Sequence, residues 1–90
     1  MMRKLTTWRE LIDFAIELKL PAGETVIAST FSEGQMDMEF NVGCGGPQGC
    51  SFTAWTQNYV LFPIYYDGSE WAGVAPRNPC DIKMSHEGGY

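Results

Sequence analysis

The sharpest change along this sequence falls at Pro21-Ala22-Gly23, where the period of the apolar residues changes from helical to two. Before this point apolar residues recur at the spacing of one helix face, and Phe14 and Leu18 widen the stripe. Thr7-Trp8-Arg9-Glu10 is typical of a capping box at the start of a helix. Proline disfavours helical geometry in the residue before it. We therefore expect one amphipathic helix over about residues 7–20.

After this loop the sequence alternates between apolar and polar residues and is interrupted by turn residues, as in antiparallel strands. The turn-like Ser32-Glu33-Gly34-Gln35 joins the first two such segments, which predicts a hairpin. Tyr66-Asp67-Gly68 predicts another. The expected strands cover about residues 25–31, 36–42, 51–57, 60–66 and 70–75, and an irregular tail covers 76–90.

One helix followed by these strands predicts an α+β fold, in which the N-terminal helix packs on an antiparallel sheet of four to five strands. The chain has 90 residues, of which 44% are hydrophobic, so we expect a single domain over 1–90 with one core. Pro63 cannot donate a hydrogen bond to a neighbouring strand, which places its strand at an edge or at a bulge. An edge strand there, or at 25–31, leaves open a homodimer formed by strand pairing.

The charged residues are unevenly distributed. The net charge is −5, and all six Lys and Arg lie near the ends, so residues 20–76 contain no basic side chain. The same span is acidic, which opposes binding to nucleic acid and favours a basic protein partner. The alternative is an acidic surface that only aids solubility.

Two cysteines flank a glycine-rich stretch, Val42-Gly43-Cys44-Gly45-Gly46-Pro47-Gln48-Gly49-Cys50. We interpret it as a hairpin tip, in which glycines supply unusual backbone angles and cysteines fill small apolar positions. A phosphate-binding loop is excluded because the stretch leads into a strand and has no lysine. The alternative is a structural zinc site, whose ligands would be Cys44, Cys50, Cys80 and His86. Without it we expect no cofactor.

The sequence contains no apolar run of signal-peptide or membrane-span length, so we expect a cytoplasmic protein without membrane contact, in which a disulfide is disfavoured. His86 is the only histidine and lies in no local catalytic motif, so we expect no enzyme. A small enzyme or ligand-binding domain with a pocket between helix and sheet is a third alternative.

Aromatic residues crowd the C-terminal half and cannot all point to one side of a strand. Some must be exposed, and exposed Trp and Tyr beside carboxylates suit a protein interface. The expected partner-binding residues are Glu33, Asp37, Glu39, Trp55, Tyr66, Asp67, Glu70 and Trp71.

With "TTWRELIDFAIEL", "VLFPIYYDGSEWAGVAPRNPC" and its acidic middle, the chain resembles small acidic accessory proteins of phages and prophages. The likeness is one of general character over the whole chain, and no motif in it is diagnostic. Some of these proteins are anti-CRISPR or anti-restriction inhibitors that occupy a basic, nucleic-acid-binding surface of a host defence complex. The resemblance implies a phage-encoded inhibitor of this type, acting in the host cytosol.

Overall fold

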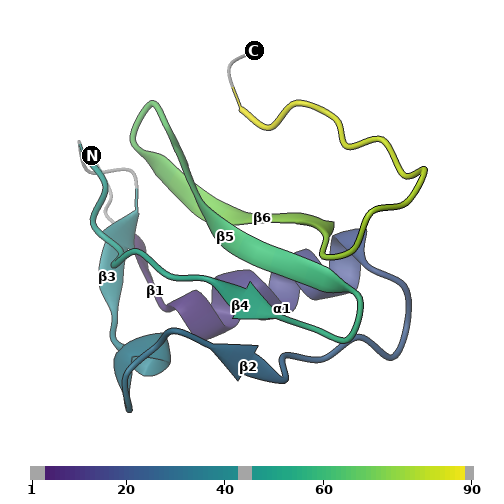
Figure 1. The fold of residues 1–90 in the computed structure, drawn as a ribbon. Coiled ribbons are helices and arrows are strands. Elements are labelled where there is room, and N and C mark those ends of the chain that lie inside the picture. The colour runs from purple at the N-terminus through teal and green to yellow at the C-terminus, as the bar shows by residue number, and fades with distance from the viewer. Residues whose placement is uncertain (1–3, 43–45, 89–90) are drawn as a thin grey trace.

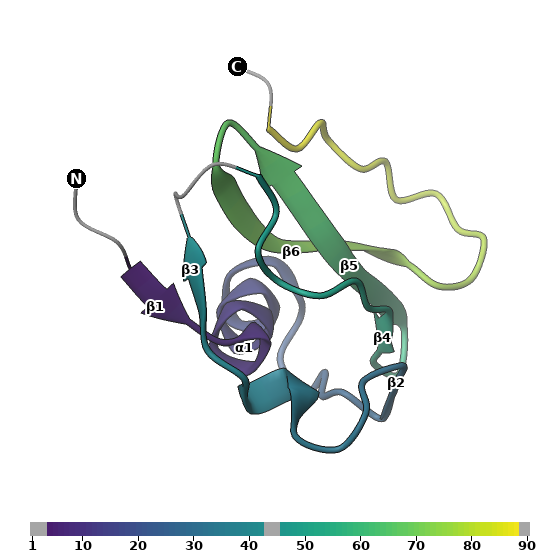
Figure 2. The ribbon, with the colours of Figure 1, turned by 90° about the vertical axis from the view of Figure 1, so that its left-hand side faces the viewer.

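The computed structural model describes residues 4–42 and 46–88 (Figure 1). Its elements, in chain order, are β1 (Lys4–Thr6), α1 (Trp8–Lys19), β2 (Ala28–Ser29), the 3-10 helix η1 (Gln35–Asp37), β3 (Phe40–Val42), β4 (Ala54–Trp55), β5 (Tyr59–Tyr66) and β6 (Ser69–Pro76). Antiparallel strands form a two-stranded sheet, β1-β3, and a four-stranded sheet, β2-β4-β5-β6. The four-stranded sheet curves around α1 (Figure 2). The expected α+β class with an N-terminal helix is therefore confirmed.

Helix α1 begins where its capping residue predicts. The Thr7 hydroxyl accepts a hydrogen bond of 3.2 Å from the Glu10 amide, which otherwise has no partner inside the helix. The Glu10 carboxylate accepts from the hydroxyl of Thr6, at 3.2 Å. The helix ends at Lys19, just before Leu20 and Pro21, within one residue of the expected boundaries at both ends.

The buried face of α1 is narrower than the sequence indicates. Trp8, Ile12 and Ala15 are buried against the sheet, whereas Phe14 and Leu18 are 61% and 63% exposed. The expectation that these two residues widen the buried stripe is wrong. Around the helix axis, Phe14 lies about 160° and Leu18 about 120° from the buried Ile12, so both point away from the buried face.

The hairpin of β5 and β6 is the longest paired unit of the structure and was correctly predicted. Its register is continuous from Tyr59 opposite Pro76 to Tyr66 opposite Ser69. The two turn residues, Asp67 and Gly68, have φ angles of 49° and 85°, as a tight hairpin turn requires.

Pro63 interrupts neither the hairpin nor its register. It pairs with Ala72 without a bulge. Strand β4 pairs with β5 only at Val60 and Leu61, so no strand of the described residues pairs with Pro63 on the side of β5 away from β6.

The expected hairpin of strands 25–31 and 36–42 does not form. In the first segment only β2 is a strand, and it pairs with β4. In the second, Gly34, with φ of 85°, opens η1, and β3 pairs with β1, a strand that the sequence reading missed. Met38, which alternation would place beside the half-buried Phe40, is 64% exposed. The expected strand 51–57 shortens to β4. Each difference comes from a long-range pairing that local alternation does not encode.

Gly49 and Cys50, at the end of the glycine-rich stretch, pack tightly against the start of the helix. The Trp8 indole N–H donates to the Cys50 carbonyl at 3.0 Å. A Cβ atom on Gly49 would lie 2.8 Å from Trp8 Cζ2 and 2.9 Å from Phe40 Cζ, both too close for real contacts. Glycine at 49 is therefore required by close packing.

Gly49→Ala should destabilise the protein by about 1–3 kcal/mol, because the added methyl group forces the Trp8 and Phe40 rings apart. Gly46→Ala is the matched control, since a Cβ atom there would meet nothing within 4 Å. Urea unfolding followed by circular dichroism measures both. Equal unfolding free energies for the two variants would contradict this packing.

Candidate functional site

The four-stranded sheet has a second apolar face, on the side away from α1. Directly paired residues point to the same side of a sheet, and the buried Ala54, Leu61 and Val74 point toward the helix. Their sequence neighbours therefore point outward. The outward-facing apolar residues, which we call the outer strip, are Trp55, Val60, Phe62, Ile64, Tyr66 and Trp71. Tyr66 is exposed, and the others are half-buried.

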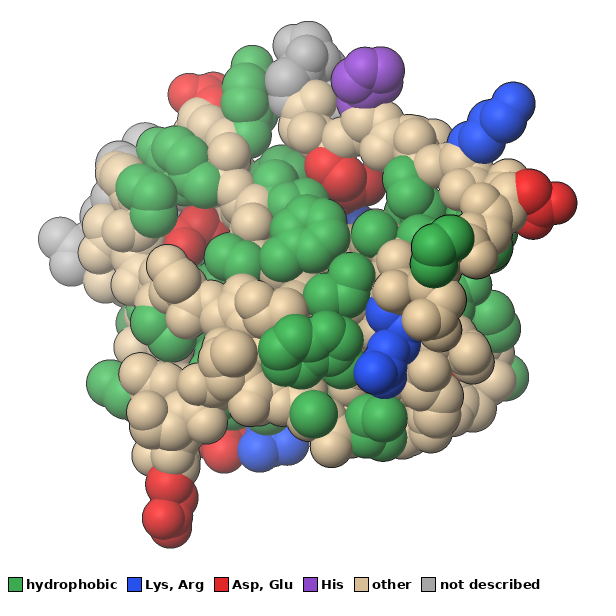
Figure 3. Space-filling model, in the orientation of Figure 1, with side chains coloured by type: hydrophobic (Ala, Val, Ile, Leu, Met, Phe, Trp, Pro, Cys, Tyr) green, Lys and Arg blue, Asp and Glu red, His purple; other side chains and the backbone are tan. Residues whose placement is uncertain are grey.

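Gly73 allows the outer strip to continue across β6. A Cβ atom on Gly73 would lie 2.5 Å from Ile64 Cδ1 and 2.8 Å from Phe62 Cε2, so these two side chains cover the glycine. Figure 3 shows hydrophobic side chains gathered over the middle of this face. Within residues 4–42 and 46–88, no helix covers it.

The structure brings four of the expected partner-binding residues together and separates the others. Trp55, Tyr66 and Trp71 share the outer strip, and Asp67 forms the adjoining hairpin turn. The remaining four are Glu33, Asp37, Glu39 and Glu70.

The acidic residues 33, 37 and 39 lie around η1, at a distance from the β5–β6 hairpin (Figure 1). Asp37 is not on a strand face, as expected from alternation, but in η1. Both of its carboxylate oxygens accept hydrogen bonds from Arg9, a terminal arginine that neutralises its charge. The expected single face of carboxylates and aromatics is therefore divided between two regions.

Glu70 is buried and points to the helix side of the sheet, with 7% of its surface exposed. Its carboxylate accepts from the amide of Gln48 at 2.7 Å and from that of Gly49 at 2.9 Å. A buried carboxylate needs such donors to offset its loss of hydration. Glu70 thus fastens residues 48–49 to β6 and is not available as a surface charge.

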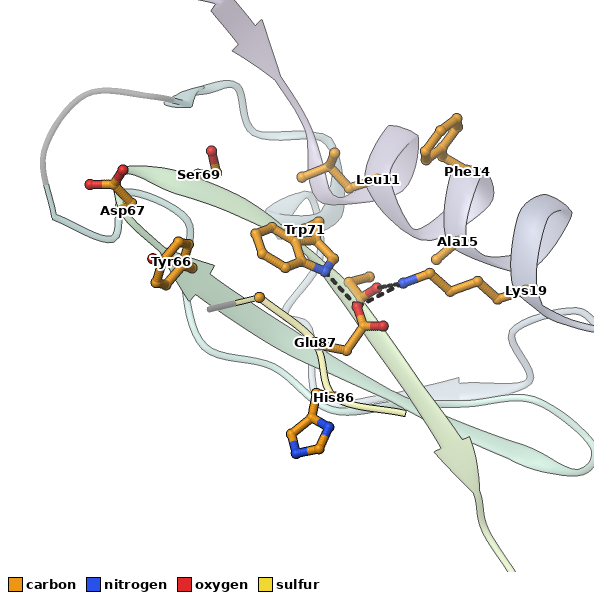
Figure 4. Close-up of a pocket in the computed structure, with 12 residues that line it drawn as sticks. Leu11, Phe14, Ala15, Lys19, Tyr66, Asp67, Ser69, Trp71, His86 and Glu87 are labelled. Carbon is orange, nitrogen blue, oxygen red and sulfur yellow. Dashed lines mark hydrogen bonds and ion pairs between the residues drawn. The ribbon is translucent and has the colours of Figure 1, made fainter. Parts of the chain in front are cut away.

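Between α1, β6 and the C-terminal segment lies a hollow of about 560 Å³. Its apolar wall includes Leu11, Ala15 and Trp71, and its polar end is a cluster of three side chains (Figure 4). There, Glu87 Oε1 accepts from Trp71 Nε1 at 2.7 Å and from Lys19 Nζ at 3.0 Å.

A second hollow, of about 580 Å³, lies beside α1 and the segment that contains β2. Asp13, Glu17 and Glu24 line it, together with apolar residues such as Ile27. Between these hollows the helix–sheet interface is filled by buried apolar side chains. The first hollow lies at the edge of that interface, where α1 meets β6, so the alternative of a ligand-binding domain or small enzyme with a pocket between helix and sheet remains a prediction from sequence.

The zinc alternative involves Cys44, which lies outside the described residues. Cys50, Cys80 and His86 are exposed, and the two cysteines are free. Among the side chains that the structure describes, no three from His, Cys, Asp and Glu form a group suited to a metal ion. A zinc site that includes Cys44 remains a prediction from sequence.

Three residues of the outer strip were missed from the sequence: Val60, Phe62 and Ile64. Their signal was available, because they alternate with Leu61, Pro63 and Tyr65 in a segment that is apolar at almost every position. Such a run is typical of a strand with two apolar faces.

No helix among the described residues has the length and apolar character needed to cross a membrane. Comparisons of this chain with protein-family models, with curated proteins and with solved structures each found no match. The site is therefore interpreted from its own geometry.

Glu70→Gln should lower the free energy of unfolding by about 1.5–3 kcal/mol, because the neutral amide presents only one acceptor oxygen to the two N–H groups that the carboxylate now holds. Glu33→Gln, at an exposed position, is the matched control. Chemical denaturation of both variants at neutral pH tests this. If Glu70→Gln is as stable as the control, the carboxylate is not needed to hold the loop.

Three carboxyl groups should link stability to pH. Hydrogen bonds from Trp71 and Lys19 lower the pKa of Glu87, those from Thr56 and Asn58 lower the pKa of Glu24, and Arg9 lowers the pKa of Asp37. A carboxyl group whose pKa is lower in the folded than in the unfolded protein stabilises the fold at pH values above its unfolded pKa. This stabilisation is lost as the pH falls through the pKa of the folded state.

The melting temperature of the wild type should exceed that of Glu87→Gln at neutral pH, and this gap should close as the pH falls below 4.5, the pKa of a free glutamate. Thermal melts over a series of pH values measure the gap. A gap that is constant down to the most acidic pH would contradict the assigned pairing of Glu87.

Proposed function

We propose that this protein is a non-enzymatic binding protein that docks on a partner protein through the outer strip. One observation carries the proposal: the sheet is apolar on both faces, and no described helix covers the outer one. Antiparallel sheets with a solvated face usually place polar residues there. A contiguous exposed apolar patch marks an interaction surface more often than chance.

The composition of the outer strip suits a protein interface. Trp and Tyr offer large contact areas for little loss of side-chain entropy, and they are enriched among residues that dominate binding energy. Tyr66 and Trp71 lie beside the aliphatic Ile64, and Trp55 lies opposite Val60 at the other end of the strip. We expect the strip to provide most of the desolvated contact.

The charge of the protein favours a basic partner. The net charge is −5, and Arg9 and Lys19 are already engaged in ion pairs with Asp37 and Glu87. The resulting negative potential attracts a cationic surface and speeds its association. It also opposes direct binding to nucleic acid. The carboxylates act here as a long-range field, since only Asp67 among the expected acidic residues adjoins the strip.

A narrower form of the proposal follows from the resemblance to phage accessory proteins. In this form the partner is a nucleic-acid-binding complex of host defence, and the acidic protein occupies its basic surface in place of phosphates. The inhibited complex should then lose its nucleic acid when the protein is added.

The test uses the full chain as bait in affinity capture, followed by binding measurements with each captured protein after purification. Phe62→Ala and Tyr66→Ala should each weaken binding about tenfold or more, as substitutions at binding hot spots do. Binding of the wild type should also weaken as salt concentration rises, because screening removes the long-range attraction.

Leu18→Ala is the matched control, since Leu18 is an apolar residue on α1 that is 63% exposed and does not line the hollow shared by Tyr66 and Trp71. Melting curves establish that each variant is folded. A captured protein that binds the Phe62 and Tyr66 variants as tightly as the wild type would refute the docking face, and affinity that is independent of salt would refute the basic partner.

A further inference from the structure

The C-terminal segment 78–88, which we call the strap, lies on the same side of the sheet as the outer strip. Figure 2 shows the β5–β6 hairpin between α1 and this segment. The strap has no helix or strand and returns toward the tip of the hairpin, so that Gly88 comes close to Tyr66 and Trp71.

The strap is fastened at its two ends. At the start, the Arg77 amide donates to the Asn58 carbonyl at 3.0 Å, and Arg77 Nη1 donates to the Thr56 carbonyl at 2.7 Å. At the far end, Glu87 binds Trp71 and Lys19. Residues 78–86 between these anchors make no hydrogen bond or ion pair with any described part of the chain.

The far anchor, which we call the latch, consists of Glu87, Trp71 and Lys19 (Figure 4). Both donors use the same carboxylate oxygen, Oε1, and the latch side chains are only partly buried. Gly88 continues the latch: it has φ of 73°, and a Cβ atom there would lie 3.2 Å from Tyr66 Cβ and 3.4 Å from Trp71 Cη2. The latch therefore covers part of two outer-strip residues.

The middle of the strap is held by little packing. Ile82 and Met84 are 50% and 48% exposed, although the strap runs on the apolar side of the sheet. A segment with exposed apolar side chains and no hydrogen bonds opens at low free-energy cost once its end is released.

We propose that the strap is a gate on the outer strip, closed by the Glu87 latch, and that a partner competes with the latch for the surface of Tyr66 and Trp71. This inference rests on the proposed function for its biological role. Besides the latch residues, the titratable side chains that line the same hollow are Tyr66, Asp67 and His86, and His86 directly precedes Glu87 in the chain. Only molecules with an open gate can bind a partner at the Trp71 end. The apparent affinity is therefore reduced in proportion to the fraction of molecules that are open.

The first measurement follows the latch itself, by NMR of the full-length protein. In Glu87→Ala the indole N–H signal of Trp71 should move upfield as its hydrogen bond is lost, and the amides of residues 78–88 should become more mobile. Gly88→Ala, which retains Glu87 but crowds Tyr66, should shift the same signals part of the way. Glu33→Ala, at an exposed position outside the strap, should leave them unchanged.

The second measurement uses the neutral apolar dye Nile red as a probe of the outer strip, located by the shifts it causes. Its dissociation constant should fall in Glu87→Ala by the same factor as the open population rises. Tyr66→Ala in the Glu87→Ala background should reverse this gain.

Two results would overturn the gate. An unchanged Trp71 signal and strap in Glu87→Ala would show that Glu87 is not a latch, and an open strap with unchanged dye affinity would show that the strap does not cover the strip. Neither result depends on a captured partner. If the latch and dye behave as expected but no partner depends on Phe62 or Tyr66, the proposed function fails while the gate stands.

Discussion

The Trp8 side chain is the contact on which the arrangement of both sheets depends. It is the first residue of α1 and is almost completely buried. Its ring lies 5.1 Å from that of Phe40 in β3 and 4.6 Å from that of Phe52, just before β4, so it joins the two-stranded sheet to the four-stranded one. Its N–H holds the Cys50 carbonyl. On the other side, Glu70 holds the amides of residues 48 and 49. The chain between the sheets is thus tied to both helix and sheet.

The elements that sequence reading located are those whose information is local. Helix α1 has its own cap at Thr7 and a proline after its end, and the β5–β6 hairpin has a two-residue turn that requires positive φ angles. Segment 25–42 has no α-helix cap and no two-residue hairpin turn, and its one positive-φ glycine, Gly34, opens η1 instead. Its strands find partners far away in the sequence, β1 for β3 and β4 for β2, and these partners are short. Alternation predicts that a segment can be extended, but not which strand it joins.

The candidate site shows the same division between local and long-range information. Glu70 and Trp71 are adjacent in a strand, so their side chains must point to opposite faces, and no single binding face can contain both. That conflict was already present in the sequence. The ion pair of Asp37 with Arg9 could not be predicted from the sequence, because it depends on η1 packing beside the helix. The aromatic half of the expected face came together because β4, β5 and β6 form one continuous register.

In the proposed function the outer strip binds a basic partner, and its competitor is a second copy of this chain; salt is expected to affect the two in opposite directions. Two copies carry −5 each and repel one another, so apolar self-association through the strip should strengthen as salt screens the repulsion. Attraction to a cationic partner should weaken under the same change. At low salt the charge therefore keeps copies apart and draws basic surfaces in. Under the proposed function, charge would therefore select the partner before any side-chain contact forms, and the aromatic residues would then set the lifetime of the complex.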